Sequence, residues 1–273
     1  MTLPLHFRWK RDEPPVGTMD ASPLLPERWA GASVRDLGAN KINVGNKEYR
    51  WDDVFQISGE NNQVWSLPGN QNYLYLGRAM KSGGIAIDGH AGDYAGLQMS
   101  GGTMMIDGSA GHRLGAGMRG GFIQVTGNVG SELAGPSPDA FEGMSDGEIH
   151  VQGSAGPRVG FHCRRGLIAV NQAIEEAAYD MQAGTLVIVQ GPWHHAGMNM
   201  KRGTVICLDT QAEPGWLPYF QPDAVFEPVI VRMILKQLGK RGYDIPVDAS
   251  ARYQHYSGDR LCGNKAEILQ RMV

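Results

Sequence analysis

The sequence predicts an all-β fold, a parallel right-handed β-helix of about seven coils of 18–19 residues, with an N-terminal arm and cap and a C-terminal helix. The first observation behind this prediction is a Met-x-x-Gly motif that recurs seven times between residues 77 and 209. Its glycines are Gly83, Gly102, Gly121, Gly147, Gly166, Gly184 and Gly203, at spacings of 19, 19, 26, 19, 18 and 19 residues. The residue three places earlier is Met in six copies and Cys163 in the other. A fixed period near 20 residues is typical of stacked repeats.

The second observation is a regular alternation of apolar residues after each of these glycines. The residues two places on are Ile85, Met104, Ile123, Ile149, Ile168, Leu186 and Val205. The residues four places on are Ile87, Ile106, Val125, Val151, Val170, Ile188 and Cys207. Alternation with a period of two, rich in β-branched residues, predicts a short strand with one buried face. Glycine suits the corners because it adopts a positive φ without a Cβ clash, and Met can fill irregular gaps between coils.

The remaining segments are assigned around these repeats. Residues 1–31 are rich in proline and predict an extended N-terminal arm with little regular structure, and residues 32–76 carry short alternating runs that predict cap strands. The β-helix repeats span residues 77–209, with an inserted loop near residues 130–141. Residues 210–273 predict a linker, a helix over residues 224–238 and a tail. Apolar residues occupy outward strand positions in the last two coils, so we expect the helix or a partner to cover them. These residues are Val187, Val189, Ile206 and Leu208.

Charge and hydropathy exclude several functional classes. The chain of 273 residues has a formal net charge of −3, which gives no general case for binding nucleic acid or an anionic membrane. It contains no run of 18 apolar residues, and its N-terminus lacks the apolar segment of a signal peptide. We therefore expect a cytoplasmic protein that does not enter membranes.

Motifs of known catalytic sites are absent from the sequence, including the P-loop, HExxH, GxSxG and a properly placed GxGxxG. Three distant cysteines, Cys163, Cys207 and Cys262, have neither disulfide-framework nor zinc-site spacing. Histidines lie near the corners of different coils without a recurring acidic or Cys ligand beside them. They are His90, His112, His162, His194 and His195. We predict no catalytic residues, no metal site and no cofactor held by this chain alone.

Basic residues recur at the corner just before the repeat glycines. They are Lys81, Arg119, Arg164, Arg165, Lys201 and Arg202. They fall on the first, third, fifth and seventh copies, which would space them roughly 9–10 Å apart along one ridge. Two interpretations remain open: a solvated corner that favours Lys and Arg, or a basic ladder that binds an acidic partner surface or a polyanionic ligand.

The repeats and the tail together resemble a known family. The repeats in question are GRAMKSGGIAIDG, LQMSGGTMMIDGSAG, GMRGGFIQVTGNVG and MQAGTLVIVQG, and the tail has Gly258-Asp259 followed by Lys265-Ala266-Glu267-Ile268. This pattern resembles the C subunit of formylmethanofuran dehydrogenase, which is itself similar to the C-terminal β-helix domain of the glutamate synthase large chain. Ala266 departs from the glycine that is usual there. Among the branches of the family, the chain looks most like the C subunit of the bacterial formyltransferase/hydrolase complex.

The resemblance implies a non-catalytic scaffold subunit in one-carbon metabolism. Its expected partners are the amidohydrolase-like A subunit, the B subunit and the formyltransferase D subunit, in a hetero-oligomer that converts formyl-tetrahydromethanopterin to formate through a methanofuran-type carrier. That carrier bears a glutamate-rich tail, which would be a ligand for the basic ladder. One alternative is the C subunit of an archaeal Mo/W formylmethanofuran dehydrogenase. An alternative of another class is a free-standing β-helix enzyme that acts on carbohydrate or acyl groups.

Overall fold

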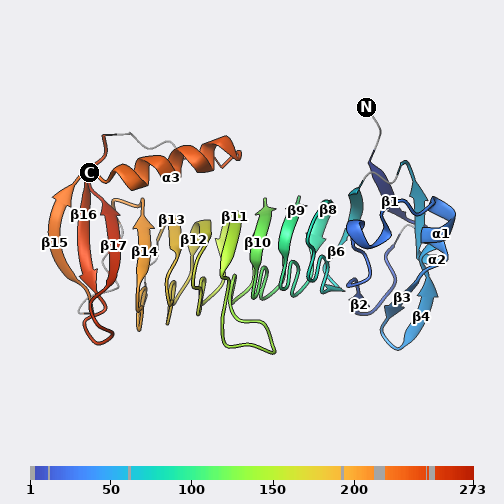
Figure 1. Cartoon of the computed structure of the whole chain (residues 1–273), viewed down its shortest axis with the longest axis horizontal. Coiled ribbons are helices and arrows are strands. Elements are labelled where there is room, and N and C mark those ends of the chain that lie inside the picture. The colour runs from blue at the N-terminus through green and yellow to red at the C-terminus, as the bar shows by residue number, and fades with distance from the viewer. Residues whose placement is uncertain are drawn as a thin grey trace.

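The structure is a computed structural model that describes residues 4–11, 13–60, 63–191, 194–211, 219–243, 245 and 250–273. The described residues are mostly β, and one large, mostly parallel sheet extends along the whole molecule (Figure 1). Its 13 strands follow the order β15-β16-β17-β14-β13-β12-β11-β10-β9-β8-β6-β1-β5. From β6 to β14 the spatial order is the chain order, as expected when each repeat contributes one strand.

Eight parallel strands form the centre of this sheet. They are β6 (Val64–Asn70), β8 (Gly84–Ala91), β9 (Ser100–Ile106), β10 (Arg119–Val125), β11 (Asp146–Ala155), β12 (Leu167–Ala173), β13 (Thr185–Gln190) and β14 (Gly203–Cys207). Their register pairs equivalent repeat positions, as in Met104 with Ile123 and Ile149 with Ile168. Every residue of the two apolar columns, and every Met or Cys of the motif, is almost completely buried. The alternation therefore identified the core correctly.

Between strands, the backbone of each repeat is held on both sides by its neighbours. In the repeat before β9, Tyr94, Gly96 and Gln98 all have positive φ, at 58°, 68° and 55°. The N–H groups of Tyr94 and Gln98 donate to carbonyls of the following repeat at 2.9 and 2.8 Å, whereas that of Gly96 donates to the preceding repeat at 2.8 Å. A side chain at Gly96 would also have its Cβ 2.5 Å from the Ile123 side chain of the next repeat. These positions therefore need both the left-handed conformation and, at Gly96, the missing Cβ.

Polar side chains near other corners connect one repeat to the next. Asp93 accepts a hydrogen bond from the backbone N–H of His112 at 2.7 Å, and the His112 ring accepts one from the N–H of Ser131 at 3.1 Å. In a neighbouring column, the His90 ring accepts from the N–H of Ser109 at 3.0 Å. These histidines satisfy backbone donors that the parallel strands leave unpaired at the corners.

The N-terminal end differs from the extended arm that the prolines suggested. β1 (Leu5–Trp9) lies inside the sheet, parallel to β6 and antiparallel to β5 (Phe55–Ser58). The physical reason is burial, because Leu5 and Phe7 alternate with polar residues and both lie in the core. The Phe7 ring lies 5.1 Å from that of Trp65 and 5.6 Å from that of Phe55. The segment therefore continues the sheet beyond β6, and β5 is the last strand at this end.

The rest of this end is a small cap. A second sheet has the order β4-β3-β2-β7. Its strands are β2 (Met19–Asp20), β3 (Lys41–Val44), β4 (Lys47–Arg50) and β7 (Tyr73–Leu74). Short helices accompany it: η1 (Pro26–Trp29), α1 (Val34–Gly38) and α2 (Trp51–Val54). Trp51 of α2 is fully buried, so aromatic side chains of the cap cover the end of the repeats, which would otherwise be exposed to solvent.

At the other end, a C-terminal hairpin continues the sheet. β17 (Ala266–Arg271) pairs in parallel with β14, and β16 (Tyr253–Gly258) and the edge strand β15 (Gln221–Phe226) follow antiparallel. Ile268 of β17 pairs with Val205, so β17 extends the buried column by one strand. An additional copy of the repeat strand thus comes from residues far downstream in the chain.

Helix α3 (Val229–Lys240) runs from β15 back along the sheet (Figure 1). Its residues Val231 and Leu238 pack in one buried cluster with Val187, Ile206 and Leu208. The helix, rather than a partner, therefore covers the apolar outer positions of the last repeats. It begins later than the sequence spacing suggested, because residues 221–226 form β15 instead of its first turn. No helix in the described parts of the chain is long and apolar enough to cross a membrane.

A buried polar cluster fixes the far end of α3 to β11. His150 is fully buried, and its Nε2 lies 2.8 Å from Oε1 of Glu148. Gln237 donates to Oε2 of Glu148 at 3.3 Å, and Nε of Arg241 lies 3.7 Å from the same oxygen. Burial opposes ionisation of Glu148, but its hydrogen bond to His150 and the charges around it outweigh burial and lower its pKa. Just beyond the helix, the Tyr243 hydroxyl donates to the β11 backbone at 2.9 Å.

Candidate functional site

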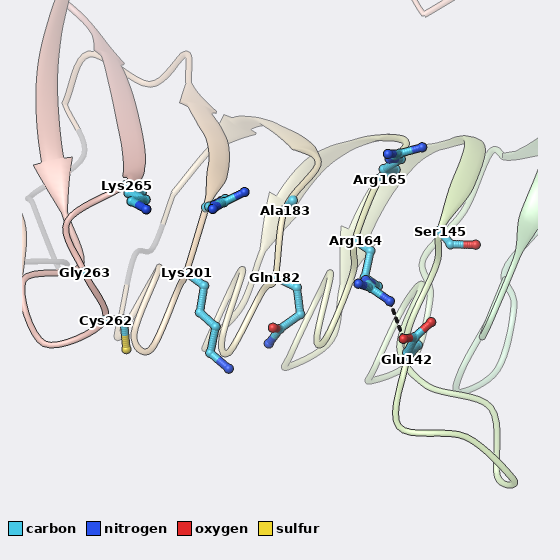
Figure 2. Close-up of a pocket in the computed structure, with 11 residues that line it drawn as sticks. Glu142, Ser145, Arg164, Arg165, Gln182, Ala183, Lys201, Cys262, Gly263 and Lys265 are labelled. Carbon is cyan, nitrogen blue, oxygen red and sulfur yellow. Dashed lines mark hydrogen bonds and ion pairs between the residues drawn. The ribbon is translucent and has the colours of Figure 1, made fainter.

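A groove of about 840 Å³ opens along the corners that precede the later strands of the sheet (Figure 2). Its walls come from the segments before β11, β12, β13, β14 and β17. The lining residues are Glu142, Ser145, Arg164, Arg165, Gln182, Ala183, Lys201, Arg202, Cys262, Gly263 and Lys265. The groove therefore combines four successive repeats with the C-terminal hairpin.

Strand register brings the cations of this groove together. Gly203 pairs with Ala266 across β14 and β17, so Arg202 and Lys265 precede neighbouring strands at equivalent positions. Parallel strands lie about 4.8 Å apart, which places these two backbone positions close to each other. Arg165 occupies the corresponding position before β12, two strands from β14. The side chains in Figure 2 project from one wall of stacked corners.

The groove carries a strong positive charge. Five cationic side chains line it, namely Arg164, Arg165, Lys201, Arg202 and Lys265. The one lining carboxylate, Glu142, is paired with Arg164 (Figure 2). Within the described residues, the other four cations have no ion-pair partner. The groove is therefore suited to an anion with several negative groups, since neighbouring cations would otherwise repel one another.

The structure groups the predicted basic residues unequally. Arg164, Arg165, Lys201 and Arg202 line the groove, whereas Lys81 and Arg119 are exposed outside it. The backbone N–H of Lys81 donates to Glu27 of the N-terminal cap at 2.8 Å. Arg119 pairs in the sheet with Asp146, directly beside the inserted loop. The predicted ridge thus divides into four groove residues and two outlying ones.

Sequence reasoning missed Lys265 and Cys262, which also line the groove. The signal for Lys265 was present: it is a basic residue three places before Ile268, just as Arg202 is three places before Val205. The copy was difficult to recognise because residues 210–264 separate it from the seventh repeat.

Cys262 does not offer an activated nucleophile. Burial and the charge of Asp259 raise the pKa of its thiol in spite of the nearby Lys201. A raised pKa keeps the thiol protonated, and the thiolate is the reactive form. The other two cysteines are buried in the core, where burial raises their thiol pKa to about 12. The groove lining thus supplies positive charge and hydrogen-bond donors.

Three of the corner histidines, His90, His112 and His162, connect neighbouring parts of the described chain, whereas the side chains of His194 and His195 are exposed. The His162 ring contacts the carbonyl oxygen of Phe141 at 2.6 Å and Asp180 at 2.9 Å, which ties the inserted loop to the next repeats. His90 and His112 accept backbone hydrogen bonds, as described above. Among the residues that the structure describes, no group of three or more His, Cys, Asp or Glu side chains could hold a metal ion.

Comparison with known proteins places a similar chain among the solved structures. Neither a protein-family model nor a curated protein matches the sequence. Among solved structures, the chain is similar to a chain in the crystal structure of the formyltransferase/hydrolase complex (FhcABCD) from Methylorubrum extorquens in complex with methylofuran. The two chains share 28% sequence identity with a TM-score of 0.85, over 98% of this chain and 99% of that chain. The predicted similarity to a chain of the formyltransferase/hydrolase complex is thereby confirmed, and it extends over nearly the whole length of this chain.

Proposed function

We propose that this chain is the C subunit, the non-catalytic scaffold, of a formyltransferase/hydrolase complex of one-carbon metabolism. The observation that carries the proposal is the near full-length match to a chain of such a complex. The complex would take formyl from formyl-tetrahydromethanopterin, pass it to a methanofuran-type carrier and release formate. Among the described residues that line the groove, the one carboxylate is ion-paired and none is a histidine, which fits a role outside the chemical steps.

A scaffold role also agrees with the architecture. We infer that the stacked repeats close into a right-handed parallel β-helix. In support, the corners on the side away from the strands repeat the same backbone hydrogen bonds from one repeat to the next, as the strands do. Two such ladders around a packed core resist bending, so partner chains bound at different repeats keep a fixed separation. The partners would be the amidohydrolase-like A subunit, the B subunit and the formyltransferase D subunit.

In this proposal the groove is a binding site for part of the carrier. A methanofuran-type carrier with a glutamate-rich tail presents a row of carboxylates, and four cations of the groove lack an ion-pair partner among the described residues. We propose that Arg164, Arg165, Lys201 and Arg202, together with Lys265, hold this tail by charge. An acidic surface of a neighbouring subunit is the competing ligand for the same residues.

Affinity purification of the tagged full chain from its native host tests the proposed function. We expect formyltransferase and amidohydrolase-like subunits to co-purify in fixed stoichiometry, and the purified assembly to release formate from formyl-tetrahydromethanopterin. Recovery of a Mo/W-pterin subunit instead would assign the chain to the archaeal-type dehydrogenase. A chain that purifies alone and hydrolyses carbohydrate or acyl substrates would refute the scaffold role.

A further inference from the structure

The outer side of α3 and the end of β15 expose a cluster of large apolar side chains. Val229, Ile230 and Met233 are 60%, 53% and 63% exposed in the first turns of the helix. Val225 and Phe226, at the end of β15, are 37% and 41% exposed just before it. Val229, Ile230 and Met233 lie on one side of the helix, since residues four apart on a helix are neighbours, and the end of β15 adjoins its first turn. We call these five residues the α3 patch. Its apolar area far exceeds what a single exposed side chain would give.

This exposure does not come from a helix that has failed to pack. The inner face of α3 is occupied by Val231 and Leu238 in the cluster with the sheet, and Ile234 and Leu235 pack against that cluster. The patch therefore consists of additional apolar residues on the side that the sheet does not reach. Leaving such side chains in water gives up the free energy that burial of apolar surface would contribute. A second surface would recover it.

Beyond the α3 patch, the exposed surface of the helix carries basic side chains. Arg232, Lys236 and Lys240 are exposed at intervals of four residues, so they form one stripe on the helix surface. No residue from Val229 to Lys240 is acidic. The stripe begins beside Met233 and extends about 12 Å, from the rise of 1.5 Å per residue. The surface is thus apolar at the start of the helix and basic towards its end.

Strand addition and self-association both fit this surface poorly. β15 is an edge strand, but Pro222 lacks an N–H and Asp223 adds charge, which are features that discourage pairing with another strand. Two copies meeting through their α3 patches would bring two basic stripes together without any acidic residue of the helix between them. An anionic membrane is also disfavoured, because the main apolar face of α3 is already buried on the sheet.

We propose that the α3 patch docks another protein subunit of the assembly, through an apolar surface bordered by carboxylates. Phe226, Ile230 and Met233 would enter the apolar part, and Lys236 and Lys240 would face the carboxylates. The inference rests on the proposed membership of a multi-subunit complex and adds which face of the chain makes a contact. Charge complementarity would set the orientation of the partner, and the apolar contacts would hold it.

Site-specific photo-crosslinking in the native assembly tests this inference. The full chain carries p-benzoylphenylalanine at position 233 or, as a control, at position 174, where the native Ile174 is 47% exposed in another part of the molecule. We expect position 233 to crosslink to a different subunit, within a peptide that contains Asp or Glu, and with a yield about tenfold above the control. Crosslinks from position 233 to a second copy of this chain, or a yield no higher than at position 174, would overturn the inference.

Two sets of variants separate apolar from electrostatic contacts. Ile230→Glu with Met233→Glu should reduce the recovered partner about tenfold or more, since central apolar contacts carry most interface energy. Lys236→Glu with Lys240→Glu should weaken recovery most at low salt, and Ile174→Glu should leave it unchanged. All three sites are exposed, so thermal unfolding of each variant should match that of the native chain.

The outcomes also separate this inference from the proposed function. If the native chain recovers no other subunit, both fail. If it recovers them while both sets of α3 variants do so equally well, only the α3 inference fails. Binding of the native chain to phosphatidylglycerol vesicles that is lost on Met233→Glu would instead assign the patch to a membrane and overturn the inference.

Discussion

The charge of the groove leads to a quantitative prediction about anion binding. The perturbation is the double substitution of Lys201→Gln and Arg202→Gln, which removes two of the four cations without an ion-pair partner among the described residues. A fluorescent hexaglutamate peptide serves as the probe, because it presents a row of carboxylates. The affinity of the full chain for this peptide should fall, since fewer cations face the same anion.

The size of the effect follows from the exposure of the groove. An exposed ion pair contributes about 0.2–1 kcal/mol, so two of them contribute about 0.4–2 kcal/mol. Because 1.4 kcal/mol corresponds to a factor of ten, the dissociation constant should rise roughly twofold to thirtyfold at low salt. Removal of the one lining carboxylate by Glu142→Gln should have the opposite sign, since it frees Arg164 for the ligand.

Fluorescence anisotropy at about 10 mM and 150 mM salt is the assay, since the Debye length falls from about 30 Å to 8 Å over this range. The matched control is Lys81→Gln with Arg119→Gln, which removes the same charge from outside the groove. The reasoning is refuted if the control loses as much affinity as the groove variant at low salt. It is also refuted if the groove variant binds as the native chain does.

Three further predictions concern stability. Met104→Ala removes a fully buried side chain and should cost about 2–5 kcal/mol in urea unfolding, whereas Met105→Ala, on the exposed face of the same strand, should cost less than about 1 kcal/mol. The pKa of Glu148 is lowered in the folded chain, so its ionised form stabilises the fold above its ordinary pKa of 4.5. This contribution is lost as the pH falls below 4.5, and Glu148→Gln should flatten the pH dependence of the melting temperature there. Gly101→Ala would place a Cβ 2.2 Å from a backbone carbonyl oxygen and should prevent or severely weaken folding, whereas Gly239→Ala, with no atom within 4 Å, should be neutral or slightly stabilising in a thermal melt.

The repeats could be predicted because each of their signals is local. The residue pairs after Gly102 and Gly121 alternate in the sequence and lie in the core as expected. A period of 19 residues then places Met104 beside Ile123 without further information. Parallel register and core composition are thus properties of the period itself.

The ends of the sheet were less predictable because their pairing is decided by distant residues. Leu5 and Phe7 show an alternation, but five prolines in residues 1–31 suggested an irregular arm. What makes them a strand is the space between β6 and β5, lined by buried rings such as Trp65. No sequence pattern within residues 1–31 indicates that this space between β6 and β5 exists.

The groove illustrates the same limit. A basic residue at a corner could be recognised from sequence, but membership of the groove depends on which corners lie beside the inserted loop and the C-terminal hairpin. Arg164 is in the groove with Glu142, which directly follows the loop, whereas Arg119, on the other side of the insertion, is outside it. Lys265 enters because β17 pairs with β14, a contact between residues about 60 positions apart.

The one-strand-per-repeat arrangement has a further consequence for how such a chain can change in evolution. Each repeat adds one strand spacing, about 4.8 Å, to the length of the molecule. Gaining or losing one whole 19-residue unit between β8 and β10 would move the aromatic N-terminal cap by that distance and leave the groove and α3 unchanged. The distance between two surface regions of the molecule is therefore set, in steps of one strand spacing, by the number of repeats between them. The side chains of each region set what it can bind.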